Sequence, residues 1–111
     1  METYKEIIEK EIKNNKAVLF MKGNPAMPQC GFSMKVSQVL TFLMGEGSYA
    51  TVDVLSDENI REGIKTYSDW PTIPQLYIDN EFIGGCDIVV EMFENGELKE
   101  LLETKGLLKD G

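Results

Sequence analysis

The sequence contains no histidine and only two cysteines among its 111 residues. Histidine is the commonest metal ligand and the commonest general base at neutral pH, so zinc-dependent hydrolysis and Cys–His nucleophilic catalysis both lack a required part within this chain. Two cysteines are also too few for the disulfide framework of a small secreted domain. These absences exclude two large classes of small enzyme and one class of extracellular domain.

Basic residues are few, at 11 against 19 acidic ones, which gives a net charge of -8. This balance opposes general affinity for nucleic acids and for anionic membranes. No apolar stretch approaches the about 20 residues that a membrane span needs, and the start alternates charges with isoleucines rather than forming the apolar run of a signal peptide. We expect no nucleic-acid or membrane partner and a cytoplasmic location, where thiols are kept reduced.

The chain has the length and composition of one globular domain. Its apolar fraction of 42% and charged fraction of 27% are near globular averages, and it has no linker-like stretch and no repeat. We therefore expect residues 1–111 to form a single domain.

Hydrophobic periodicity alternates between helix and strand along the chain. The expected strands are Ala17–Met21, Tyr49–Leu55, Gln75–Ile78 and Glu81–Ile83. Five helices are expected. The first follows Thr3 and the second begins at Cys30. The third is capped by Ser56, the fourth is capped by Asp87, and the last lies between Leu98 and Gly106. The first two strands and the helix between them form a βαβ unit with parallel strands, and the last two strands form a hairpin. With a cysteine opening the helix after the first strand, this order predicts a thioredoxin-like α/β fold: a central mixed four-stranded sheet flanked by helices on both faces.

Cys30 is the candidate reactive group. A helix N-terminus favours a thiolate by about 0.3 to 1 kcal/mol, which is less than one pKa unit at about 1.36 kcal/mol per unit. A nearby cation adds to this effect, and Lys22 at the end of the preceding strand is the nearest candidate. We expect Cys30 to be substantially thiolate near neutral pH. The alternative is a small apolar residue at a helix start.

Ser33 stands where a dithiol oxidoreductase has its second, resolving cysteine. A hydroxyl does not attack a mixed disulfide in this way, so glutathione or another external thiol must release any adduct on Cys30.

Three further features are expected near Cys30. A cis proline at Ile73-Pro74 would leave the backbone of Ile73 free to pair with an extended peptide, whereas a trans proline would make a rigid turn. The helix start at Cys86 offers free N–H groups to a carboxylate and Asp87 to an ammonium, unless Asp87 is an ordinary cap. Arg61 is a second cation or a solvated charge. Together these groups suit a small peptide with a free amino end, a carboxylate at each end and a central thiol, which is the form of glutathione.

The chain resembles the monothiol glutaredoxins of the CGFS type, specifically the short single-domain kind. The resemblance covers nearly the whole chain and rests on motifs in the same order and spacing. These are Lys22, the proline-containing loop before Cys30-Gly31-Phe32-Ser33, Trp70-Pro71-Thr72-Ile73-Pro74-Gln75 and Gly84-Gly85-Cys86-Asp87.

The resemblance implies that two protomers and two glutathiones hold a [2Fe-2S] cluster, with Cys30 of each protomer as a ligand. A two-iron cluster commonly has four thiolate ligands, and one protomer with one glutathione supplies two. The implied glutathione contacts are Lys22 and Arg61 at the glycine carboxylate, the backbone of Ile73, and Cys86 and Asp87 at the γ-glutamyl end. The implied partners are a second copy of the chain, BolA-like proteins and iron–sulfur acceptor proteins.

We expect a carrier that transfers [2Fe-2S] clusters in iron–sulfur protein assembly. One alternative is a glutathione-dependent oxidoreductase in which Cys30 is the catalytic nucleophile on protein–glutathione mixed disulfides. Another is a regulatory module that mainly binds a BolA-like protein. Cys86 is open to three interpretations: a backbone contact to glutathione, which we prefer, a buried structural thiol, or a slow disulfide partner of Cys30.

Overall fold

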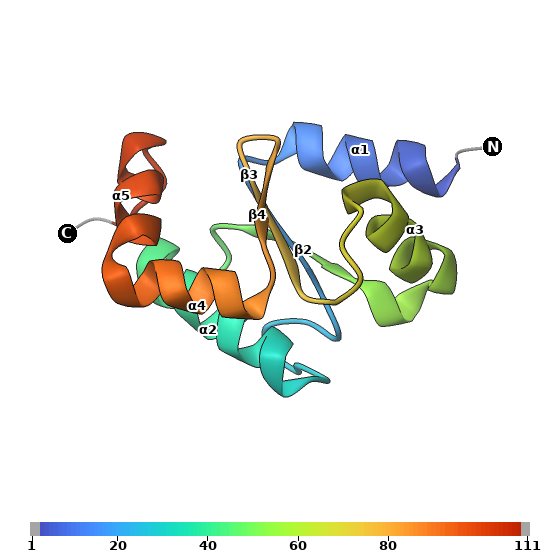
Figure 1. The fold of residues 1–111 in the computed structure, drawn as a ribbon, viewed down its shortest axis with the longest axis horizontal. Coiled ribbons are helices and arrows are strands. Elements are labelled where there is room, and N and C mark those ends of the chain that lie inside the picture. Colours follow the sequence, from blue (N-terminus) through green and yellow to red (C-terminus); the bar gives the residue numbers. More distant parts are fainter. Residues whose placement is uncertain (1–2, 110–111) are drawn as a thin grey trace.

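The structure is a computed structural model, and it describes residues 3–109. The predicted domain at 1–111 therefore extends past the described residues at both ends. The helices are α1 (Tyr4–Asn14), α2 (Gly31–Met44), α3 (Glu58–Ser68), α4 (Cys86–Asn95) and α5 (Glu97–Thr104). The strands are β1 (Ala17–Met21), β2 (Ala50–Asp53), β3 (Gln75–Ile78) and β4 (Glu81–Gly84), and a short 3-10 helix, η1 (Val54–Ser56), follows β2 (Figure 1).

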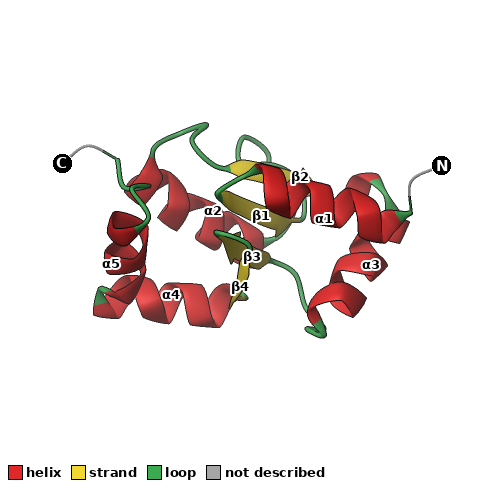
Figure 2. Ribbon diagram, turned by 90° about the horizontal axis from the view of Figure 1, so that it is seen from above, coloured by secondary structure: helices red, strands yellow, loops and turns green. Residues whose placement is uncertain are grey.

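The four strands form one mixed sheet in the order β2-β1-β3-β4. β1 and β2 are parallel, whereas β1–β3 and β3–β4 are antiparallel. α1 and α3 lie on one side of the sheet, and α2 and α4 lie on the other (Figure 1; Figure 2). The predicted thioredoxin-like α/β fold is confirmed. None of the helices within residues 3–109 is both long enough and apolar enough to cross a bilayer.

β1 is buried along its whole length because both faces of the sheet are covered at this strand. Val18 and Phe20 pack with the α1 and α3 side of the core, and Leu19 and Met21 pack with the α2 and α4 side. This alternation follows the two-residue period of a strand. β1 therefore ends at a fixed position inside the sheet, and the next residue, Lys22, starts the loop that leads to Cys30.

β2 is shorter than predicted: it ends at Asp53, whereas the expected strand reached Leu55. The Asp53 side chain accepts a hydrogen bond from the Leu55 N–H at 2.9 Å, and the Ser56 hydroxyl donates to the Asp53 carbonyl at 2.7 Å. These bonds turn the chain into η1. Val54 is fully buried although it is not in the strand, so the apolar pattern identified burial correctly and strand length incorrectly.

The start of α3 also differs from the prediction. Asp57, and not Ser56, is the N-cap, and its carboxylate accepts from the Asn59 N–H at 2.8 Å. Ser56 is already engaged in η1, so its neighbour takes the capping position. Ile60 and Ile64 on this helix are buried in the core, whereas Tyr67 is 37% exposed and its ring lies against Tyr77.

The loop between β1 and α2 is folded tightly on itself. Gly23 has a φ of 85° and forms a bridge with Pro28, and the Gln29 N–H donates to the Lys22 carbonyl at 2.9 Å. A side chain at position 23 would overlap the Met27 carbonyl oxygen and the backbone of Gln29. The loop therefore depends on glycine at this position.

We expect Gly23→Ala to destabilise the protein more than Gly47→Ala. Both glycines have a positive φ, but the space around Gly47 is open. Alanine should cost about 1 to 2 kcal/mol at position 47 from the left-handed backbone alone, and about 1 to 3 kcal/mol more at position 23 from the overlap. Urea unfolding of both variants beside the unchanged chain measures this difference. Equal losses would show that the loop adapts without cost.

Candidate functional site

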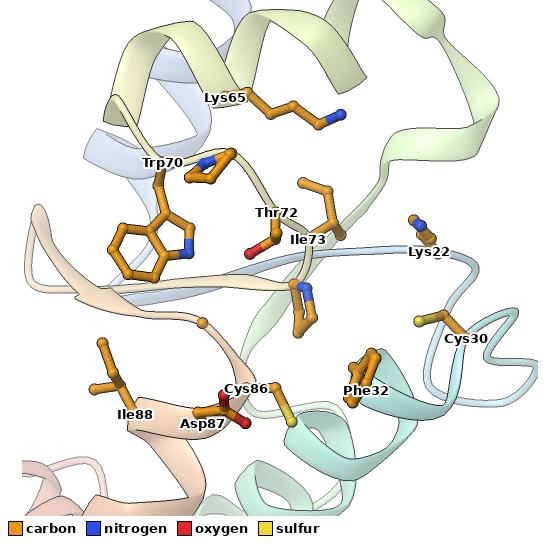
Figure 3. A pocket seen from close by; sticks show the side chains of 13 residues that line it. Lys22, Cys30, Phe32, Lys65, Trp70, Thr72, Ile73, Cys86, Asp87 and Ile88 are labelled. Carbon is orange, nitrogen blue, oxygen red and sulfur yellow. The ribbon is translucent and has the colours of Figure 1, made fainter.

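A cleft of about 680 Å³ lies where the β1–α2 loop, the segment before β3 and the start of α4 meet (Figure 3). Its lining residues come from segments far apart in the sequence. They are Lys22, Cys30, Phe32, Lys65, Trp70, Pro71, Thr72, Ile73, Pro74, Gly85, Cys86, Asp87 and Ile88. Five of the six residues proposed from sequence, Lys22, Cys30, Ile73, Cys86 and Asp87, thus line one cleft, and Arg61 does not.

Cys30 is the N-cap residue of α2, and its pKa is lowered. The largest cause is the backbone N–H of Ser33, which favours the thiolate; burial opposes it, and the Phe32 N–H, the Lys22 charge and the Ser33 hydroxyl add to the lowering. The sulfur makes no hydrogen bond with full capping geometry, so these N–H groups act mainly as the positive end of the helix. The direction agrees with the prediction, but the helix start contributes more than Lys22 does.

Ser33 has a structural role that sequence reasoning did not identify. Its side chain is fully buried, and its hydroxyl oxygen accepts a hydrogen bond from the Lys22 N–H at 3.0 Å. This bond joins the end of β1 to the first turn of α2, the turn that carries Cys30. The sequence did contain a signal, because a small hydroxyl residue three positions after a helix cap lies in the first turn of that helix.

The cations near the cleft belong to two elements. Lys22 lines the cleft from the β1–α2 loop, and Lys65 lines it from α3. Arg61 lies one turn before Lys65 on the same helix, and its Nε atom is buried with no acceptor within residues 3–109. Lys65 also pairs with Glu62 at 3.4 Å. Lys65 was not predicted as a site residue, although its spacing of four residues from Arg61 places both on one helix face.

The segment before β3 presents free backbone groups to the cleft. The Ile73-Pro74 peptide bond is cis. Within the described part of the chain, neither the N–H nor the carbonyl of Ile73 makes a hydrogen bond. The fully buried Gln75 holds the segment from beneath, since its side-chain amide donates to the carbonyls of Trp70 and Thr72 at 3.1 Å each. The role of Gln75 was not predicted.

The opposite wall of the cleft is the start of α4. This helix begins at Cys86, its N-cap is Gly85, and Asp87 lies in the first turn. The prediction that Asp87 caps the helix is therefore wrong, and no side chain caps the first N–H groups of α4. Those N–H groups are available to an anion at the cleft wall. Gly85 permits a close approach of Trp70, whose Nε1 atom would lie 3.1 Å from a Cβ atom at that position.

The two cysteines are both unpaired, and they differ in character. Burial raises the pKa of Cys86, and the charges of Asp87 and Cys30 raise it further, while Lys35 lowers it. The pKa of Cys30 is thus lowered, and that of Cys86 is raised. In the part of the chain that the structure describes, no three cysteine or carboxylate side chains gather closely enough to hold a metal ion.

Comparison with known proteins agrees with this geometry. The Glutaredoxin family model matches residues 17–83, more than half of the chain. An uncharacterized monothiol glutaredoxin, ycf64, of Porphyra purpurea is 55% identical over 100 residues, which cover 90% of this chain and 92% of that protein. A probable monothiol glutaredoxin 2 of Rickettsia typhi is 52% identical over 102 residues and 90% of each chain.

Relatives with organellar names also match. Glutaredoxin-related protein 5, mitochondrial, of Danio rerio is 49% identical over 90% of this chain and 64% of its own length. Among solved structures, a monomeric truncated mutant of Trypanosoma brucei 1-C-Grx1 superimposes with a TM-score of 0.84 at 41% identity, over 100% of this chain and 99% of that one.

A cysteine of lowered pKa at the start of the first helix after β1, beside a proline-containing wall, defines a glutaredoxin site. With Ser33 in place of a second cysteine, the chain belongs to the monothiol glutaredoxins within the glutaredoxin family.

We expect Ser33→Ala to raise the pKa of Cys30, because the Ser33 hydroxyl helps to lower it. The same change should destabilise the fold by about 1 to 3 kcal/mol, because the Lys22 N–H loses its acceptor. Ser37→Ala is a matched control: Ser37 is also buried on α2, and its hydroxyl bonds to Tyr49 at 3.0 Å, away from the cleft. The control should lose stability without changing the Cys30 pKa. Iodoacetamide rates against pH and urea unfolding measure both effects, and equal pKa changes in the two variants would contradict this role of Ser33.

The opposite pKa shifts predict selective alkylation. At neutral pH Cys30 should react with iodoacetamide faster than Cys86, because a larger fraction of Cys30 is thiolate. Peptide mass spectrometry after short labelling times gives the two rates separately. As pH rises the difference should narrow, and a Cys86 rate equal to that of Cys30 at neutral pH would refute the assignment.

Proposed function

We propose that this protein binds glutathione in the cleft, and that two chains with two glutathiones hold a [2Fe-2S] cluster, which the protein carries to acceptor proteins. The observation that supports this most is the single cysteine of lowered pKa in the site. Cys30 lies at the cleft with a lowered pKa, and the buried hydroxyl of Ser33 occupies the position of a resolving thiol.

The charges and backbone groups of the cleft suit glutathione along its length. Lys22 and Lys65 would bind the glycine carboxylate, with Arg61 on the same helix face as Lys65. The free backbone of Ile73 would pair with the cysteinyl residue as one short added strand. The uncapped start of α4 would receive the γ-glutamyl carboxylate, and Asp87 its ammonium.

A bridged cluster fits the exposed surroundings of Cys30. A two-iron cluster commonly needs four thiolates, of which one chain and one glutathione supply two. Met27 is 66% exposed and Phe32 63% exposed, both close to Cys30 in sequence. Large exposed apolar side chains around a ligand residue suit the close approach of a second protein chain. In this proposal the approaching chain is either a second copy of this protein or a BolA-like protein that contributes a histidine.

A second candidate function is glutathione-dependent reduction of protein–glutathione mixed disulfides. The lowered pKa of Cys30 favours it, because a thiolate is the attacking species. The thiolate would attack the glutathione sulfur of the mixed disulfide, release the protein thiol, and leave glutathione on Cys30 for a second glutathione to remove. The cytoplasmic location stays a prediction, since the relatives that match this chain include proteins with mitochondrial and chloroplastic names.

Anaerobic reconstitution with iron, sulfide and glutathione tests the carrier proposal. We expect visible charge-transfer absorption with one [2Fe-2S] cluster per two chains, lost in Cys30→Ser and lost when glutathione is withdrawn. Cys86→Ser should keep most of the cluster, because Cys86 has a raised pKa and is proposed to contact glutathione through its backbone.

Iron and sulfide quantitation gives the stoichiometry, and size exclusion gives the number of chains. A colourless protein that turns over rapidly in a glutathione-coupled disulfide assay would support the reductase instead. Equal cluster loss in Cys30→Ser and Cys86→Ser would contradict the ligand assignment.

A further inference from the structure

Asp53 lies at the end of β2, outside the cleft lining, and its carboxylate is bonded to the loop that leads to Cys30. A single oxygen, Oδ1, accepts two backbone hydrogen bonds, from the Gly23 N–H and from the Leu55 N–H, both at 2.9 Å. The bond to Leu55 is local and caps η1. The bond to Gly23 connects residues 30 positions apart in the sequence.

That long-range bond is one of three that fix the backbone around Lys22. The N–H of Lys22 donates to the Ser33 hydroxyl at 3.0 Å, and its carbonyl accepts from the Gln29 N–H at 2.9 Å. The following peptide N–H, that of Gly23, donates to Asp53. Each bond comes from a different part of the fold: α2, the loop itself and β2.

The bond from Asp53 in β2 holds the backbone N–H of a glycine, Gly23. Glycine populates more backbone conformations than any other residue, and Gly23 has a φ of 85°. The Ser33 bond holds the peptide before Lys22, whereas the Gln29 and Asp53 bonds hold the carbonyl and the N–H of the one planar peptide between Lys22 and Gly23. The direction in which the Lys22 side chain leaves the loop depends on this peptide.

We propose that Asp53 is a positioning residue for glutathione: it holds the Lys22–Gly23 peptide so that the Lys22 ammonium faces the cleft. This inference rests on the proposed function, in which Lys22 binds the glycine carboxylate. Asp53 itself does not touch the ligand. Its contribution to affinity therefore passes entirely through Lys22.

Two substitutions separate the bonds that Asp53 makes. Asp53→Asn keeps an oxygen in the same place and should change affinity less than about twofold. Asp53→Ser keeps a good cap for the Leu55 N–H, but its hydroxyl is one bond shorter and does not reach Gly23. Asp53→Ser should weaken binding about two- to tenfold, the range that one net hydrogen bond represents.

Binding is measured on the full chain by calorimetry with S-methylglutathione, which cannot form a disulfide with Cys30. The four arms are the unchanged chain, Asp53→Ser, Lys22→Met and the double variant. We expect Asp53→Ser to weaken binding in the unchanged background and to have no further effect once Lys22 is methionine. A loss of the same size in both backgrounds, or no loss at all, would overturn the inference.

Asp57→Ser is the matched control for a general effect on stability. Asp57 also caps a helix, through the Asn59 N–H at 2.8 Å, but it makes no bond to the Lys22 loop. It should leave S-methylglutathione affinity unchanged, and weakening equal to that of Asp53→Ser would count against a specific role for Asp53. If the unchanged chain does not bind S-methylglutathione, the proposed function fails and this inference fails with it. That outcome is distinct from the ones above, in which the unchanged chain binds and only the role of Asp53 is contradicted.

Discussion

The hydrogen bond between the Lys22 N–H and the Ser33 hydroxyl is the contact on which the site depends. Its two ends belong to elements that cannot move independently. β1 is buried along its length and paired on both sides, and Ser33 is fully buried in the first turn of α2. The bond therefore sets the position of the helix start relative to the sheet. Because the pKa of Cys30 is lowered chiefly by N–H groups of that helix start, the reactivity of the sulfur follows from how strand and helix are joined.

The local surroundings explain why the pKa values of two cysteines in one cleft shift in opposite directions. Both begin a helix: Cys30 is the N-cap of α2, and Cys86 is the first residue of α4. Burial weighs most on Cys86 and outweighs the nearby Lys35 charge, which lowers its pKa, whereas the backbone N–H of Ser33 weighs most on Cys30. Position at a helix start is thus not sufficient to make a thiol reactive. The balance between burial and hydrogen bonds from the first-turn N–H groups decides the direction of the pKa shift.

Local pattern predicted the elements and most of the cleft. The buried run of β1, the helical spacing of α2 and the hairpin of β3 and β4 each carry their signal within a few residues. What sequence missed depends on contacts between distant segments. The role of Ser33 depends on Lys22, whose N–H donates to the Ser33 hydroxyl. The role of Gln75 depends on the carbonyls of Trp70 and Thr72, which accept from its side-chain amide. The cap of α3 was misplaced because Ser56 and Asp57 are adjacent short polar residues and Ser56 is engaged in η1. The cap of α4 was misplaced because Gly85, which has no side chain to mark it, takes that position.

The compact loop at Gly23 has a consequence for the thermodynamics of ligand capture. Its turn is closed by a bridge to Pro28 and by backbone hydrogen bonds, and the segment contains two prolines whose φ angles are fixed by their rings. Little conformational freedom is therefore left in this wall of the cleft to be lost on ligand binding. In the proposed glutathione complex, the entropy lost on association would be mostly that of the peptide itself, which is the condition under which a rigid analogue gains most over a flexible one.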